Sequence, residues 1–246
     1  MLRRRHRAGV SADAYYREAL GAWQKTIKWR LRLVTYSLAA PAPLLLLLPH
    51  LGEFLCGIWL GAILTLNVAV WEEPPWLIER WRFGREGERW TEKELRKVER
   101  RGWSVRHDLA NGVYGNLDHI VVGPGGLFLI DTKHLHGRVA MEGGELVCRH
   151  EASPLYKYSL DKPTEQVGTA AYYLERRLKN TLGWLPWVHG VIALWAEFAE
   201  EEAQIKEVNI VHGRSLAEWL LRQPRRWPET YEAAIREAVA ALPAAD

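Results

Sequence analysis

The segment "HIVVGPGGLFLIDTKH", residues 119–134, contains two apolar runs on either side of a glycine-proline turn. Apolar runs bounded by Gly and Pro predict an antiparallel β-hairpin. If the two strands pair symmetrically across the turn, Asp131 faces Asp118, which stands just before the segment. Lys133 lies two residues beyond Asp131, on the same face of the strand and about 6.6–6.8 Å further along it. A hydrophobic hairpin therefore carries two acids and a base on one face.

Like charges that are directly opposed on two strands destabilise a sheet unless something compensates them. A divalent cation would do so, because carboxylate oxygens are ligands of hard ions such as Mg²⁺, or Mn²⁺ in its place. Such an ion lowers the pKa of a bound water and offsets charge on phosphorus, and the ammonium of Lys133 could stabilise the transition state. Asp118, Asp131 and Lys133 thus predict a phosphodiester-hydrolysing site.

The residues alone leave two alternatives open. In the first, the two acids simply end two strands, and Lys133 covers one of them as an ion-pair partner. In the second, a bulge at Gly125-Gly126 shifts the strand pairing by one residue and moves one acid to the opposite face.

Periodicity along the rest of the chain predicts alternating helices and strands. A polar helix with a narrow apolar stripe precedes the hairpin, and a second helix follows it behind Pro163. The expected elements are a helix at 85–101, strands at 103–109, 188–196 and 207–212, a hairpin at 138–149 around Gly143-Gly144, and helices at 164–182 and from 215. This order predicts an α/β domain with a mixed central sheet flanked by helices.

The N-terminal part differs in composition. Residues 1–32 form a basic arm with nine Lys and Arg against two acids, suited to phosphates or anionic headgroups. Residues 33–51 and 54–71 are two apolar runs joined by a short turn, and each is about long enough to cross a bilayer. They predict a transmembrane helical hairpin over 33–71, with a buried or re-entrant hairpin as the alternative.

Basic residues flank the predicted hairpin on both sides, whereas its turn has none. The positive-inside rule then predicts a multi-pass protein of the cytoplasmic membrane, with both termini in the cytosol and the lipid bilayer as a partner.

Paired prolines in "EEPPW" predict a linker over 72–83, so the globular domain should span 84–223, followed by a C-terminal helix and tail over 224–246. Two widely spaced cysteines indicate neither a disulfide framework nor a thiolate metal site.

Three stretches resemble one known family. They are "GE" at 87–88 on the first predicted helix, "NLDHIVVGPGGLFLIDTKHLHGRV" at 116–139, and "KPTEQ" at 162–166 ahead of the second. Together they resemble the NERD (nuclease-related) domain, over about residues 84–195. That family is assigned to the PD-(D/E)xK nuclease-like superfamily, with a restriction-endonuclease-like mixed sheet flanked by helices. The resemblance implies metal-dependent cleavage of DNA or RNA.

Carried over by position, the resemblance assigns a role to five residues. Asp118 and Asp131 correspond to the metal-binding acids, and Lys133 corresponds to the catalytic lysine. Glu88 resembles the helical glutamate that faces the site, and Gln166 the glutamine of the following helix. NERD domains more often have Glu at the position of Asp131, and the shorter side chain changes its reach to the metal.

Histidines near the hairpin raise the possibility of zinc, but strand alternation points His119 away from Asp118, and His134 and His136 lie beyond the strand end. His134 could instead contact a substrate phosphate. The sequence therefore predicts a membrane-anchored, Mg²⁺-dependent nuclease whose nucleic acid is cut on the cytosolic side. The alternative is a catalytically silent nucleic-acid-binding or scaffold module at the membrane.

Overall fold

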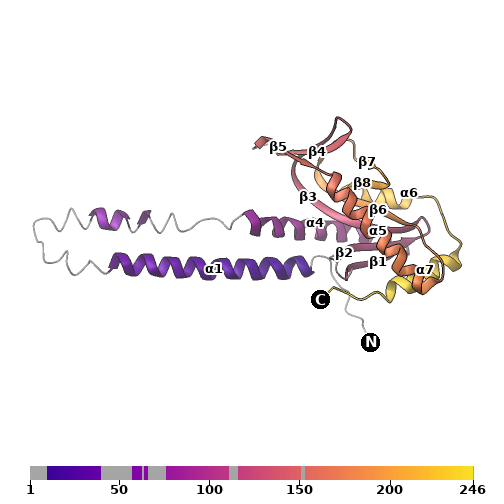
Figure 1. Cartoon of the computed structure of the whole chain (residues 1–246), viewed down its shortest axis with the longest axis horizontal. Helices are drawn as coiled ribbons and strands as arrows, with labels where there is room; N and C mark the ends of the chain where they lie inside the picture. Colours follow the sequence, from indigo (N-terminus) through magenta and orange to yellow (C-terminus); the bar gives the residue numbers. More distant parts are fainter. Residues whose placement is uncertain are drawn as a thin grey trace, which may run out of the picture. The chain divides into compact units, whose positions relative to one another are not determined.

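The computed structural model describes residues 10–39, 57–62, 64–65, 76–110, 116–150 and 153–245. These residues divide into two compact units, Met1–Asp13 with Arg82–Asp246, and Ala14–Trp81. The second unit contains most of helix α1 (Val10–Ala39). The first unit holds the sheet, which Figure 1 labels strand by strand.

The described strands form one eight-stranded mixed sheet in the order β1-β2-β3-β6-β8-β7, with β4 and β5 extending from β3. β3 pairs in parallel with β6, and β6 in parallel with β8, whereas the other pairs are antiparallel. The strands are β1 (Ser104–Ala110), β2 (Asn116–Gly123), β3 (Gly126–Glu142), β4 (Glu145–His150), β5 (Ser153–Ser159), β6 (Val188–Phe198), β7 (Glu202–Ile205) and β8 (Val208–His212). The predicted mixed sheet is confirmed.

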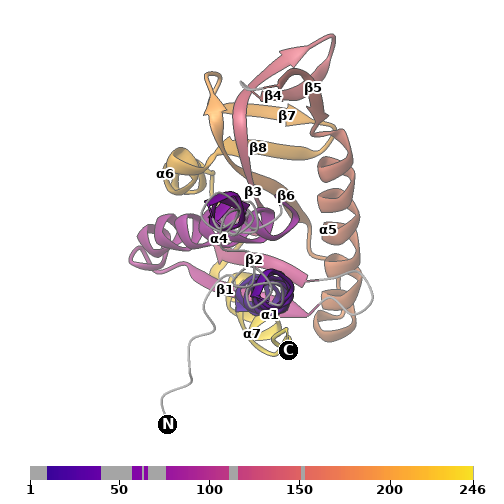
Figure 2. The ribbon, with the colours of Figure 1, turned by 90° about the vertical axis from the view of Figure 1, so that its left-hand side faces the viewer.

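Helices cover both faces of this sheet. α5 (Asp161–Leu182) and α7 (Glu229–Ala240) bury their apolar sides on one face, against residues such as Leu129 of β3. α4 (Trp76–Glu99) and α6 (Leu216–Arg222), which follows a 3₁₀ turn, pack on the other face against Phe128. Figure 2 shows α5 on one side of the sheet and α4 and α6 on the other. The alternation of β3 thus decides which of its residues meet which helix.

The hairpin at the centre of the sequence prediction is confirmed in register. Val122 pairs with Leu127 and Ile120 with Leu129, and no bulge interrupts the β2–β3 ladder. The ladder extends one pair further than expected, to Gly123↔Gly126, so Pro124 and Gly125 alone form the loop. A Cβ on Gly125 would lie 2.6 Å from Gln223 Cβ, which explains why glycine occupies this tight turn.

The hairpin predicted at 138–149 is confirmed, because β3 and β4 pair on either side of Gly143-Gly144. β3 is longer than the sequence suggested, because it runs from Gly126 into the first arm of this hairpin and ends at Glu142. Its ladder with β6 shifts register between His134 and Arg138, where the strand is irregular. Gly137 lies there with φ +135°, and a Cβ on it would be 2.1 Å from the carbonyl oxygen of Arg149. Only glycine fits this close approach of β3 to β4.

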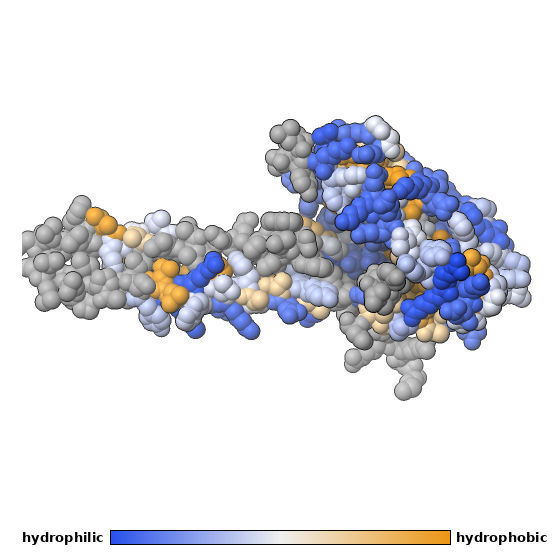
Figure 3. Space-filling model, in the orientation of Figure 1, coloured by the Kyte–Doolittle hydropathy of each residue, from blue (hydrophilic) through white to orange (hydrophobic). Residues whose placement is uncertain are grey.

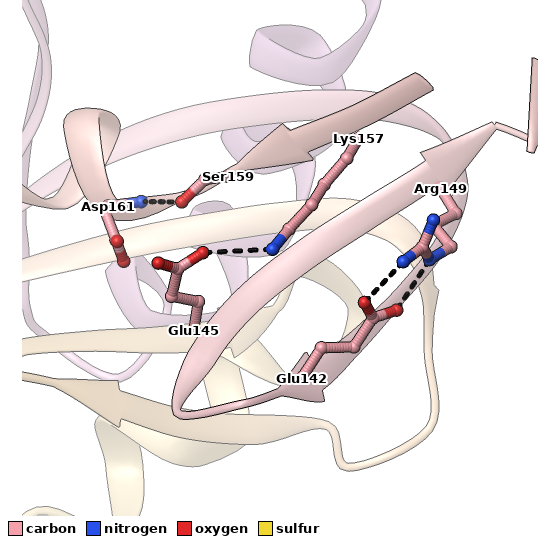
Figure 4. A network of polar contacts seen from close by, with 6 residues as sticks. All are labelled: Glu142, Glu145, Arg149, Lys157, Ser159 and Asp161. Atoms are coloured by element: carbon pink, nitrogen blue, oxygen red, sulfur yellow. Dashed lines mark hydrogen bonds and ion pairs between the residues drawn. The ribbon is translucent and has the colours of Figure 1, made fainter. Parts of the chain in front are cut away.

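The β3–β4–β5 extension ends in ion pairs and leads directly into α5 (Figure 4). Arg149 binds both carboxylate oxygens of Glu142, at 2.7 Å each, and Lys157 pairs with Glu145 at 3.2 Å. The backbone N–H of Asp161 donates to Ser159 Oγ at 3.1 Å. Figure 3 shows that the surface over β4 and α5 is mainly hydrophilic. α5 begins at Asp161, three residues earlier than the sequence predicted.

The prediction of a multi-pass membrane protein is wrong. In the part of the chain that the structure describes, no helix is long and apolar enough to cross a membrane. Leu33, where the first predicted span begins, lies inside α1, a single helix that also carries Lys25, Lys28, Arg30 and Arg32. Residues 40–56, 63 and 66–71 of the predicted hairpin lie outside the described residues.

Candidate active site

The β2–β3 ladder stops at His119↔Ile130, one residue pair before the two acids. Beyond this point the backbone N–H of Thr132 donates to Asp118 Oδ2 at 2.9 Å, where a continuing ladder would use a backbone carbonyl. On its other side β3 stays paired with β6, through Asp131↔Ile192 and Lys133↔Leu194. The end of the ladder therefore brings the Asp118 carboxylate beside the segment that carries Asp131 and Lys133.

Lys133 is bound to its neighbouring acid. Its Nζ lies 2.6 Å from Asp131 Oδ2, and both side chains are about one quarter exposed, at 28% and 27%. Burial lowers the pKa of the Lys133 ammonium, but the charges of Asp131 and then Asp118 outweigh it, so the pKa lies above its ordinary value. Lys133 is therefore a fixed positive charge rather than a base in this arrangement.

The surroundings of Asp118 disfavour its ionised form. Burial and, next, the charge of Asp131 raise its pKa from 3.8 to about 7, although Lys133 and the Thr132 N–H act in the opposite direction. A shift of this sign means that burial and the neighbouring carboxylate together disfavour the ionised form of Asp118, despite the charge of Lys133. A cation bound beside the two aspartates would oppose both effects.

A pocket of about 500 Å³ opens beside these acids, between β2, β3 and the first turns of α5. Asp118 and Asp131 line one side of it, and Lys162 and Gln166, one helical turn apart, line the other. Glu165 also lines it, paired with Lys206 at 2.7 Å. The structure thus brings together Asp118, Asp131 and Gln166, with Lys133 ion-paired to Asp131.

Glu88 and His134 are placed differently. α4 packs on the opposite face of the sheet from α5, and a Cβ on Gly87 would lie 2.9 Å from His134 Cβ. Glycine there lets α4 approach β3 closely, which accounts for the first half of the "GE" motif. His134 contacts the backbone carbonyl of Phe83 at 3.1 Å. Neither Glu88 nor His134 is among the described residues that line the pocket.

The donor set of the pocket can be tested against the metal that the sequence implied. Among residues 10–39, 57–62, 64–65, 76–110, 116–150 and 153–245, no group of three or more His, Cys, Asp or Glu is arranged to hold a metal ion. Mg²⁺ is usually bound by one or two carboxylates, with waters and substrate phosphates as its other ligands. Asp118 and Asp131 fit that requirement, and the raised pKa of Asp118 supports it.

Two residues near the site were not singled out from the sequence. Thr132, between the two motif residues, binds Asp118 through its amide, and Lys162 faces the acids from α5. The sequence could have indicated Lys162, because it stands four residues before Gln166 in "KPTEQ" and so shares its helix face. It could not have indicated the role of the Thr132 amide, since that role depends on where the β2–β3 ladder ends.

The comparison with known families agrees with the resemblance found in the sequence. Residues 83–195 match the model of the nuclease-related domain, NERD. This segment of the chain is therefore similar to nuclease-related domains, a likeness that points to nucleic acid as substrate or partner. Placement in the PD-(D/E)xK superfamily is consistent with the match. No curated protein and no solved structure matches the chain.

Proposed function

We propose that the chain is a metal-dependent nuclease that hydrolyses phosphodiester bonds of DNA or RNA in the pocket beside α5. The observation that carries the proposal is the joint placement of Asp118, Asp131 and Lys133 on one face at the end of the β2–β3 ladder. The family match supports nucleic acid as the partner. The raised pKa of Asp118 supports the need for a bound cation.

In the proposed reaction, a water oxygen forms a bond to phosphorus while one P–O ester bond breaks. Asp118 and Asp131 would hold Mg²⁺ or Mn²⁺, which when bound lowers the pKa of water and offsets charge on the phosphate. Lys133, protonated and fixed by Asp131, places a positive charge for the phosphate oxygens in the transition state. The exposed amide of Gln166 can donate to phosphate or accept from the attacking water.

Cleavage by the purified full chain tests this proposal. Single-stranded DNA, double-stranded DNA and RNA are incubated with Mg²⁺, with Mn²⁺, or with a chelator. We expect cleavage of at least one substrate with either ion, none with the chelator, and a loss of about 100-fold or more in Asp131→Asn. The matched control is Glu145→Gln, which removes a carboxylate that pairs with Lys157 on the β4–β5 hairpin.

Two outcomes would contradict the proposal in different ways. Cleavage that continues in the chelator, or equally in Asp131→Asn, would exclude the metal site. Binding of nucleic acid without cleavage under any of these conditions would instead support a catalytically silent binding module.

Lys162 is the basic residue among those that line the pocket, and within the described part of the chain it forms no ion pair. We expect it to contact a backbone phosphate. Lys162→Ala should weaken binding and reduce the slope of log K against log salt by about 0.7–0.9, the value for one phosphate contact. Fluorescence anisotropy in chelator measures this, with Lys157→Ala as the control. An unchanged slope would exclude the contact.

A further inference from the structure

A chain of buried polar side chains runs behind the candidate site, on the face of the sheet that α4 covers. His107 Nδ1 lies 2.8 Å from His119 Nδ1, and His119 Nε2 lies 3.2 Å from Thr132 Oγ1. Thr132 Oγ1 lies 3.0 Å from Thr91 Oγ1, which is 2.8 Å from Trp195 Nε1. The two histidines and both threonines are buried, with His119 and Thr91 completely so. The chain thus joins α4 to β1, β2, β3 and β6.

Counting protons gives this chain one direction. The Trp195 indole N–H can only donate, so Thr91 Oγ1 accepts from it. The single proton of Thr91 goes to the carbonyl oxygen of Gly87 at 3.0 Å, which can only accept. Thr132 must therefore donate its own proton to Thr91. Its oxygen is then left to accept from His119 Nε2.

The same count fixes the tautomers of both histidines. His119 is completely buried, and its two ring nitrogens contact His107 and Thr132, neither of which is an acid, so a charged ring would be uncompensated and the ring is neutral. Burial also lowers the pKa of His107 to about 4, so that ring is neutral at pH 7. A neutral His119 that donates from Nε2 has a bare Nδ1, which accepts from the Nδ1–H of His107. The order of donation is therefore His107 to His119 to Thr132 to Thr91.

We propose that this directed hydrogen-bond chain positions the Asp131-Thr132-Lys133 segment, with His107, His119 and Thr91 holding the Thr132 hydroxyl while the Thr132 amide holds Asp118. The ladder with β2 has already ended at Ile130, so the bond between His119 and the Thr132 hydroxyl joins β2 to β3 beyond the last backbone pair. The residues are positioning residues, because they lie on the face opposite the pocket. The functional part of the inference rests on the proposed nuclease activity, whereas the structural part does not.

Nuclear magnetic resonance on the full-length protein, labelled with ¹⁵N in histidine, tests the direction of the hydrogen-bond chain at pH 7. Long-range ¹H–¹⁵N correlations distinguish the two tautomers from each other and from the doubly protonated ring. We expect the Nε2–H tautomer for His119 and the Nδ1–H tautomer for His107. A His119 ring protonated on Nδ1 would overturn the proposal, whatever the enzyme assays show.

Thr132→Val removes the hydroxyl and nearly keeps the shape of the side chain, and Thr132→Ser restores the hydroxyl. We expect the amide of residue 132 to exchange with solvent about tenfold faster or more in the Val variant, and near the original rate in the Ser variant. Loss of such indirect contacts typically costs about 10–100-fold in activity. In the Val variant kcat should fall by that factor with KM nearly unchanged, and Ser should recover most of it.

Val211→Ala is the control, because Val211 is buried in the core cluster on the α4 side of the sheet and takes no part in the hydrogen-bond chain. Activity and amide exchange are measured for each variant at the same number of degrees below its own Tm. If Thr132→Val changes amide exchange and kcat no more than Val211→Ala does, the positioning role is excluded. An inactive original chain would refute the proposed function, and the amide exchange would still decide whether Thr132 is held as described.

Discussion

Lys133→Ala is expected to lower the rate of phosphodiester cleavage by about 100-fold to 1,000-fold, the usual cost of removing a group that stabilises transition-state charge. Lys133 is the cation fixed at 2.6 Å from Asp131, and the two acids keep its pKa high, so it carries its charge throughout the working pH range. Single-turnover cleavage at saturating enzyme measures the chemical step directly. Binding of nucleic acid should change far less than the rate.

Lys157→Ala is the matched control for Lys133→Ala, since Lys157 also pairs with a carboxylate but lies on the β4–β5 hairpin. Its rate should stay close to that of the original chain. Cleavage by Lys133→Ala at the original rate would mean that the pocket beside α5 does not carry out the reaction. Partial recovery in Lys133→Arg would show that positive charge, rather than the shape of lysine, matters there.

Asp118→Asn is expected to abolish cleavage and at the same time to stabilise the fold. The folded state holds the pKa of Asp118 at about 7, above its ordinary 3.8, so folding disfavours the ionised form. Stability is therefore lost as pH rises from about 4 to 7, and the whole penalty is present above 7. Asn carries no charge and keeps an oxygen that can accept from the Thr132 amide.

Thermal unfolding across pH tests this prediction. At pH 8 without metal, the Asn variant should melt higher than the original chain by roughly 5 °C, and the difference should disappear near pH 4. Adding Mg²⁺ should raise the Tm of the original chain more than that of the variant, since a ligand stabilises only the form that binds it. A variant that melts lower than the original at pH 8 would show that the Asp118 charge is already compensated.

Much of the site could be predicted from one short stretch of sequence. The apolar alternation and the glycine-proline turn determine the β2–β3 register, and the register places Asp118 beside Asp131 and Lys133. Local pattern sufficed because the residues concerned lie on two strands joined by a two-residue loop. Gln166 was singled out by the family resemblance, and it lines the pocket.

Other features depend on contacts between distant parts of the chain. The parallel ladder between β3 and β6 joins residues about sixty positions apart, and no local pattern specifies it. The buried bond between His119 and Thr132 likewise requires knowing that both point toward α4. β7 (Glu202–Ile205) was missed because its four residues alternate between half-buried and exposed, which gives a weak signal.

The membrane prediction failed for a different reason. The apolar run that starts at Leu33 does not begin a new element, because α1 runs without interruption from Val10 to Ala39. The apolar residues at its end therefore share a helix with the basic residues before them. Whether a segment can cross a membrane depends on the whole helix that contains it. In the described part of the chain, no helix is long and apolar enough to do so.

The central claim is that Asp118 and Asp131 together form one divalent-cation site. Electron paramagnetic resonance of Mn²⁺ titrated into the full chain, without nucleic acid, measures that site directly. We expect one bound Mn²⁺ per chain, with affinity reduced on the order of tenfold or more in Asp118→Asn and in Asp131→Asn. Unchanged Mn²⁺ binding in the variant that carries both substitutions would contradict it.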